Sequence, residues 1–122
     1  MAIQVDDILD IDGIVYVSVP YTAHPYGLSC AAHDADRHAA HLIKMGFVIF
    51  SPISHSHPIA RVGGIDPCSH ELWMAQNDRF MQACFAMVAV KLPGWKSSVG
   101  MALEAEYFQR AGKPIVEMEP LP

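Results

Sequence analysis

Residues 13–19 have the sequence Gly-Ile-Val-Tyr-Val-Ser-Val, and this stretch decides the fold. It is short, rich in β-branched and aromatic residues, and stopped by Pro20, which is typical of a buried strand in a parallel sheet. A loop over residues 20–28 precedes residues 29–45, whose spacing predicts an amphipathic helix that stops at Gly46. Its core face is expected to contain Ala31, Ala35, Ala39, Leu42 and Ile43. The first unit of the predicted fold is therefore a strand followed by a crossover helix.

Strand and helix continue to alternate along the rest of the chain. Further strands are predicted at 47–50, 85–92 and 115–118, helices at about 69–84 and 99–111, and a long loop at 51–67. This alternation predicts a three-layer α/β fold of the flavodoxin or Rossmann type, with helices on both faces of a parallel sheet of about four to five strands. Ligands bind at the carboxyl ends of the strands in such folds, so we expect the loops at 20–28, 51–68 and 93–98 to converge on one crevice.

Composition limits the classes of function. With 122 residues, of which 52% are hydrophobic and 17% charged, the chain supports one compact core, so residues 1–122 are expected to form a single domain. A net charge of −5, with 8 Lys and Arg residues and no basic run, disfavours polymeric nucleic acid as a partner. The apolar runs are too short to span a membrane, which favours a cytoplasmic protein without a membrane partner.

Cysteine usage and the known cofactor motifs add two exclusions. Three cysteines without a Cys-x-x-Cys spacing argue against a disulfide framework and a zinc knuckle, and favour free thiols. Neither a Gly-x-Gly-x-x-Gly motif nor a Gly-x-x-x-x-Gly-Lys-Ser/Thr motif occurs. The sequence therefore indicates neither a dinucleotide-binding site nor a P-loop. No cofactor is therefore expected.

The helix predicted at 99–111 carries two glutamates in opposite environments. On a helical wheel Glu104 falls in the middle of a wide apolar arc, whereas Glu106 lies on the narrow polar side, four residues before Arg110. A carboxylate on a buried face is costly unless it is hydrogen-bonded or lines a cavity, and its pKa tends to rise. Glu104 is therefore a candidate site residue, although a neighbouring Ser, Tyr or subunit can also hold such an acid in a purely structural role.

The segment from Ser98 to Glu104 is Ser-Val-Gly-Met-Ala-Leu-Glu, and Gly112, eight residues beyond Glu104, begins Gly-Lys-Pro-Ile. This arrangement resembles the Gly-x-x-x-Glu…Gly-Lys-Pro signature of nucleoside 2-deoxyribosyltransferases and their deoxynucleotide N-glycosidase relatives. Gly100 and Glu104 match the motif's glycine and catalytic glutamate. The run Gly-Trp-x-x-Ser-x-Gly-x-x-x-Glu, which starts at Gly94, is more similar still to a bacterial and phage branch of this superfamily whose function is unknown.

The resemblance extends to other positions of the family's site. Tyr16 is placed like a tyrosine that lies near the catalytic glutamate, and Asp78 matches an active-site aspartate by its offset from that glutamate. Ser98 matches a serine that contacts the sugar-phosphate in nucleotide-cleaving relatives. Two positions depart from the family, because Glu106 stands where glycine is common and Cys84 stands where an aspartate usually ends the helix.

The resemblance implies an N-glycosidase or a deoxyribosyltransferase. Such a reaction passes through an oxocarbenium-like transition state, which a carboxylate beside C1′ stabilises or traps as a glycosyl-enzyme. Glu104 is expected to be this nucleophile, Asp78 to protonate or orient the leaving base, and Tyr16 to hold the nucleophile in place. The residues expected to bind substrate are Pro20, His55, Trp95, Ser98 and Gly100. The predicted partner is a small nucleoside or nucleotide.

Two other classes of function stay open. A metal-dependent hydrolase would use histidines of the long loop, although their spacing matches no recognised ligand motif. Its ligands would be His55 and His57, with His24, His70 and Asp66 in addition. The histidines of the first helix are expected on its solvated face: His33, His38 and His41. The other class, a nucleotide-binding module without chemistry, would keep the crevice and hold Glu104 in a salt bridge.

The apolar arc of the last predicted helix is wider than one face of a sheet needs. Burial of the excess apolar surface against another subunit would explain this width. We therefore expect a homo-oligomer, either a dimer or a tetramer.

Overall fold

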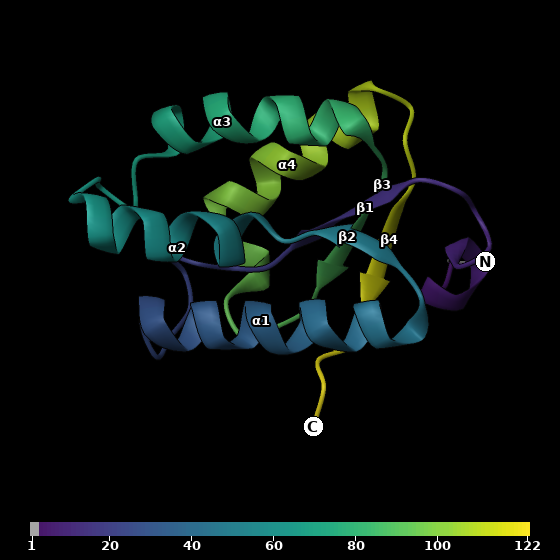
Figure 1. Cartoon of the computed structure of the whole chain (residues 1–122), viewed down its shortest axis with the longest axis horizontal. Coiled ribbons are helices and arrows are strands. Elements are labelled where there is room, and N and C mark those ends of the chain that lie inside the picture. Colours follow the sequence, from purple (N-terminus) through teal and green to yellow (C-terminus); the bar gives the residue numbers. More distant parts are fainter. Residues whose placement is uncertain (1–2) are drawn as a thin grey trace.

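The computed structural model describes residues 3–122 of the chain (Figure 1). In chain order its elements are the 3-10 helix η1 (Val5–Ile8), β1 (Ile14–Ser18), α1 (Leu28–Met45), β2 (Val48–Phe50), α2 (Pro52–Gly63), α3 (His70–Ala83), β3 (Cys84–Val90), the 3-10 helix η2 (Trp95–Ser97), α4 (Val99–Arg110) and β4 (Ile115–Met118). All four strands pair in one parallel sheet. The predicted α/β class, with helices packed on a parallel sheet, is therefore confirmed.

The strands lie in the order β2-β1-β3-β4. The chain therefore adds β2 along one edge of β1 and then returns to add β3 and β4 along the other edge. Strand β1 pairs with β2 from Ile14 opposite Val48, and with β3 as far as Ser18 opposite Ala89. In open parallel sheets such a reversal leaves a crevice at the carboxyl ends of the two central strands, where ligands bind. The carboxyl end of β1 is therefore the expected place of a site.

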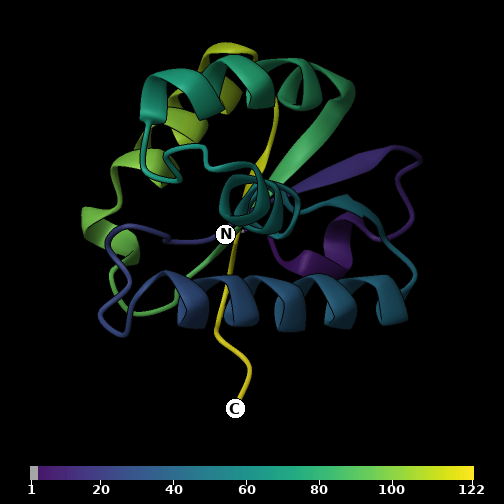
Figure 2. The ribbon, with the colours of Figure 1, turned by 60° about the vertical axis from the view of Figure 1, so that its left-hand side comes forward.

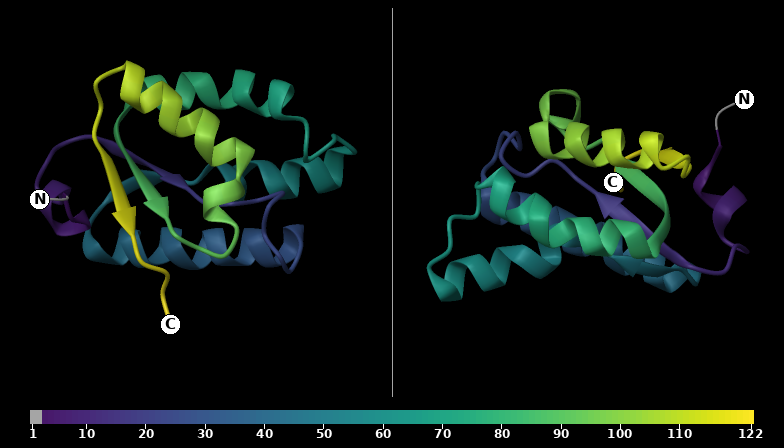
Figure 3. Two further views of the ribbon diagram at one scale, coloured as in Figure 1. Left: turned by 180° about the vertical axis from the view of Figure 1, so that it is seen from behind. Right: turned by 90° about the horizontal axis from the view of Figure 1, so that it is seen from above.

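Helices cover both faces of the sheet (Figure 1, Figure 2). Val15 and Val17 pack in a core with residues of α1 and η1, whereas Tyr16 packs with residues of α3 and α4. Because side chains alternate across a strand, Ser18 faces the same layer as Tyr16. The view from behind shows α3 and α4 together on one side of the sheet and α1 on the other (Figure 3).

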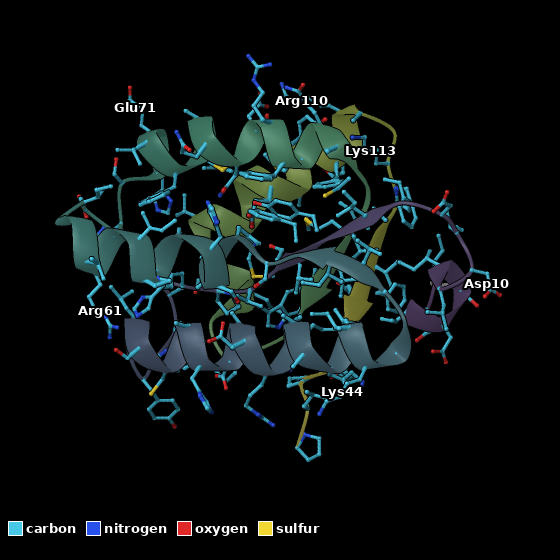
Figure 4. The ribbon with its side chains drawn as sticks, viewed as in Figure 1. Asp10, Lys44, Arg61, Glu71, Arg110 and Lys113 are labelled. Atoms are coloured by element: carbon cyan, nitrogen blue, oxygen red, sulfur yellow. The ribbon has the colours of Figure 1, made fainter. Side chains whose placement is uncertain are left out.

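Charged side chains lie mainly at the periphery of the molecule. Figure 4 shows Asp10, Lys44, Arg61, Glu71 and Arg110 pointing outward from their elements. Apolar side chains fill the space between the sheet and both helical layers. Within residues 3–122, none of the helices combines the length and the apolar character that a membrane span requires.

The predicted loop at 51–67 is wrong, because most of it forms helix α2. Pro52 occupies the first position of the helix, where its missing N–H needs no partner. The buried residues Pro52, Ser56 and Ala60 recur every four positions, which places them on one face of the helix. Packing of this face outweighs the low helix propensity of a segment with Pro58 in its interior.

Two side chains of α1 exchange their predicted environments. Ile43, expected on the core side, is 56% exposed, whereas His38, expected in solvent, is fully buried. His38 donates from Nδ1 to the carbonyl oxygen of Asp34 at 2.7 Å and accepts at Nε2 from the backbone N–H of Leu121 at 3.1 Å. The segment after β4 covers the histidine, and the periodicity of α1 alone does not reveal this tertiary contact.

Candidate functional site

Glu104 of α4 is the centre of the candidate site. Among the Asp, Glu, Lys and Arg residues of the described chain it alone is buried, with 6% of its surface exposed. The Tyr16 hydroxyl donates a hydrogen bond to Oε2, and Ser18 Oγ donates to Oε1 at 2.6 Å. Both carboxylate oxygens therefore receive a donor from β1.

The spacing of residues on α4 turns Glu104 toward the sheet. The buried residues of this helix are Met101, Glu104 and Phe108, which lie three and four positions apart on one face. Glu106 lies outside, with Oε1 at 3.9 Å from Arg110 Nε in an i,i+4 pair. This is the contrast between the two glutamates that the helical wheel indicates.

Packing around the ring of Tyr16 fixes the position of its hydroxyl group. The ring is fully buried, and its centroid lies 5.9 Å from that of Phe50 and 5.6 Å from that of Phe108, both in tilted geometry. A donor whose ring is held by such contacts keeps its direction, which is the preorganisation that a catalytic carboxylate needs.

Burial sets the protonation of the carboxyl group. It raises the pKa of Glu104 to about 7, while the hydrogen bonds from Ser18 and Tyr16 favour the carboxylate and oppose this rise. Burial, followed by the proximity of Glu104, raises the pKa of Tyr16, so its phenol stays protonated and able to donate. Above about pH 7 the site therefore holds a carboxylate that neutral donors solvate, which suits it to stabilise a developing positive charge.

A cavity of about 60 Å³ lies beside Glu104. Its walls come from the loop after β1 and from the starts of α3 and α4. Ser69 and Ser98 cap these helices, accepting from the N–H of Leu72 at 3.4 Å and of Met101 at 3.2 Å, so two partly positive helix ends meet at the cavity. The space is large enough for only a few water molecules, so a whole nucleoside would bind only if the walls moved apart.

The structure brings four of the predicted site residues together. Ser98, Gly100 and Glu104 line the cavity, and Tyr16 contacts the glutamate from β1. A Cβ atom on Gly100 would lie 3.9 Å from His70 Cε1, which is an ordinary contact. The glycine therefore keeps space open in the cavity rather than relieving a clash.

Asp78 does not line this cavity, which corrects the prediction of a second carboxylate. Its Oδ2 accepts from Gln82 Nε2 at 2.7 Å along α3. The face of α3 that lines the cavity includes His70 and Asn77, two turns apart. A step of one residue rotates a helical side chain by about 100°, so Asn77 lines the cavity and its neighbour Asp78 does not. Among the described lining residues, Glu104 is the one carboxylate.

Three residues predicted to bind substrate lie away from the cavity. The Trp95 ring, with two lysine ammonium groups 5.8 and 5.6 Å from its centroid, lines a separate groove of about 890 Å³ along α4 and β4. The His55 ring is exposed on helix α2, where it packs at 5.5 Å from each of two phenylalanine rings. Pro20 is fully buried after β1 and does not line the cavity, although its neighbours Val19 and Tyr21 do.

The histidines proposed as metal ligands are dispersed. His55 and His57 are two residues apart on a helix, so their side chains diverge, and His57 Nδ1 lies 2.6 Å from the Tyr21 hydroxyl. His24 Nε2 lies 2.9 Å from a carboxylate oxygen of Asp34. In the part of the chain that the structure describes, no three His, Cys, Asp or Glu side chains are grouped as metal ligands. The geometry therefore gives the metal-dependent alternative no support.

Several polar residues of the site were not predicted, among them Ser18, Tyr21 and Asn77. Ser18 could have been found, because it lies two residues after Tyr16 and so shares its strand face. Tyr21 and Asn77 line the cavity, but they come from a loop and from a helix whose rotation the sequence leaves uncertain by one residue. Their place depends on how α3 packs against the sheet.

Residues 13–120 match a protein family described as Domain of unknown function (DUF1937). The chain belongs to this family. The matched region begins just before β1 and ends after β4, so the DUF1937 domain contains every residue that lines the cavity. Among curated proteins, none matches the chain significantly.

Proposed function

We propose that this DUF1937 domain cleaves the N-glycosidic bond of a nucleoside or nucleotide, by hydrolysis or by transfer of the sugar. The observation that carries the proposal is the buried carboxylate of Glu104, which two hydroxyl donors hold beside a cavity. The similarity of Gly100, Glu104 and Gly112-Lys-Pro to the signature of nucleoside 2-deoxyribosyltransferases supports the same chemistry.

In this proposal Glu104 attacks the anomeric carbon of the sugar. A carboxylate oxygen forms a bond to C1′ while the C1′–N bond breaks and its electron pair leaves with the base. Water or a second base then attacks C1′ and releases the carboxylate. Tyr16 and Ser18 keep the carboxylate oriented, and their hydrogen bonds favour its ionised, nucleophilic form.

The departing base must also gain a proton, and in place of Asp78 we propose Tyr21 as the donor. Tyr21 lines the same cavity as Glu104, and its hydroxyl lies 2.6 Å from His57 Nδ1. Transfer of the hydroxyl proton to the base nitrogen leaves a phenolate, which then takes up the proton that the attacking water or second base loses. One side of the cavity then supplies the nucleophile and another the acid.

The proposal is tested by measuring free base released from ribo- and deoxyribonucleosides and from their 5′-monophosphates. Glu104→Gln should lower kcat by about 1,000-fold or more, because it removes the nucleophile but keeps its shape. Glu106→Gln is the matched control, since it makes the same change on the exposed side of α4, and its kcat should stay within about twofold.

A fall of less than about tenfold in Glu104→Gln would contradict the proposal. So would a wild-type protein that releases no base from any member of the panel. Binding of a nucleotide without turnover would favour a binding module instead.

A further inference from the structure

Asn77 carries an unpaired acceptor inside the protein. The residue is 7% exposed, and among the described residues its Oδ1 is the one buried side-chain oxygen or nitrogen without a hydrogen-bond partner. Buried polar atoms in proteins almost always have partners, and leaving one unpaired is destabilising. An atom kept in this state points to a partner that arrives from outside the chain.

Asn77, the residue that carries the unpaired atom, lines the same cavity as the reactive carboxylate, and its Oδ1 is covered until the walls move apart to admit a substrate. Asn77 on α3 and Glu104 on α4 both line this cavity, whose volume is about 60 Å³. A space of this size beside the nucleophile admits part of a substrate, and that part must include the carbon that is attacked. The group that meets Asn77 therefore belongs to the sugar or is attached directly to it.

The chemistry of an amide oxygen selects its partner. Oδ1 accepts hydrogen bonds and cannot donate them, so it attracts O–H and N–H groups and repels carbonyl, carboxylate and phosphate oxygens. The donors of a nucleoside sugar are its hydroxyl groups. We infer that Asn77 Oδ1 accepts a hydrogen bond from a sugar hydroxyl of the substrate and so selects sugars that carry it. This inference rests on the proposed glycosidic reaction.

The kinetic test compares Asn77→Leu with the wild type on three substrates. These are a 2′-deoxynucleoside, its 3′-deoxy derivative and its 5′-deoxy derivative. The wild type should discriminate against one derivative by about 10- to 100-fold in kcat/KM, because the missing hydroxyl leaves Oδ1 unpaired. Asn77→Leu should lower kcat/KM for the parent nucleoside by about the same factor, and it should change kcat/KM for that derivative by less than about twofold. Equal losses on all three substrates, or no loss, would overturn the inference.

A measurement without substrate checks the premise that Oδ1 has no partner in the protein. Leucine is similar in size to asparagine, so the midpoint of thermal unfolding of Asn77→Leu should equal or exceed that of the wild type. Gln76→Leu, on the exposed neighbouring position of α3, is the matched control and should leave the midpoint unchanged. A lower midpoint in Asn77→Leu alone would mean that the amide already has a partner, and would overturn the inference.

Calorimetric binding of the same three nucleosides separates this inference from the proposed reaction. If the wild type releases no base but binds the parent more tightly than one derivative, and Asn77→Leu abolishes that difference, the reaction fails and the recognition stands. If base is released and Asn77→Leu leaves the discrimination intact, the reaction stands and the recognition fails. If none of the three nucleosides binds, both fail.

Discussion

The buried carboxyl group of Glu104 links the stability of the fold to pH. Burial raises its pKa from an ordinary value of 4.5 to about 7, so the folded protein keeps a proton that the unfolded chain has already lost. The resulting stabilisation is complete below pH 4.5 and is lost as the pH rises to about 7. At 1.36 kcal/mol for each pH unit between these two pKa values, the loss amounts to about 3 kcal/mol.

Glu104→Gln isolates this contribution, because glutamine keeps the shape of the protonated acid and does not titrate. Urea unfolding of both proteins at several pH values gives the free energy of unfolding of the variant minus that of the wild type. We expect this difference to increase by about 3 kcal/mol between pH 4.5 and pH 8, which makes the variant relatively more stable in alkali.

Glu106→Gln is the matched control on the exposed side of α4, and its free energy of unfolding should stay within about 0.5 kcal/mol of the wild-type value. A difference for Glu104→Gln that stays constant with pH would refute the reasoning. A difference that decreases as the pH rises would refute it as well, since it would place the pKa of the folded state below the ordinary value.

Three further predictions concern Tyr16, Gly94 and His38. Tyr16→Phe removes one donor to Glu104 and should destabilise the fold by about 1–2 kcal/mol at pH 8 and less at pH 5, as measured by urea unfolding. Gly94→Ala should cost about 3 kcal/mol or more in the same assay, because φ is +92° and the added Cβ would lie 2.2 Å from a carbonyl oxygen. Gly64→Ala is the control, because Gly64 has a φ of +67° but open space around the position of a Cβ. It should lower the free energy of unfolding by about 1 kcal/mol, and equal losses in the two variants would contradict the steric argument. Burial lowers the pKa of His38 below 6.5, so its stabilising effect is present above that pH and is lost as the pH falls. Wild type and His38→Gln should therefore converge in unfolding free energy toward low pH, and divergence would contradict this.

Elements with a strong local pattern were predictable from the sequence. The strands at 14–18 and 115–118 contain β-branched residues in short apolar runs, and both were placed within a residue or two. The contrast between Glu104 and Glu106 follows from helical geometry alone, because the two side chains point to opposite sides of one helix.

Features that depend on tertiary contacts were not predictable in this way. The prolines of α2 are typical of a loop, yet packing of one helical face overrides them. The choice between Asn77 and Asp78 depends on the rotation of α3 about its axis, which contacts with the sheet decide. His38 is buried because the segment around Leu121 covers it, and the sequence pattern of α1 does not predict this long-range contact.

The central claim is that Glu104 forms a bond to the sugar, and mass spectrometry tests this most directly. A 2′-deoxy-2′-fluoroarabinonucleoside destabilises the oxocarbenium-like transition state and slows breakdown of a glycosyl-enzyme, so the intermediate should accumulate. We predict that the wild-type protein gains the mass of one fluorinated sugar, that the added mass maps to Glu104, and that Glu104→Gln gains none. Release of base by the wild type without any adduct, or the same adduct on Glu104→Gln, would contradict the account.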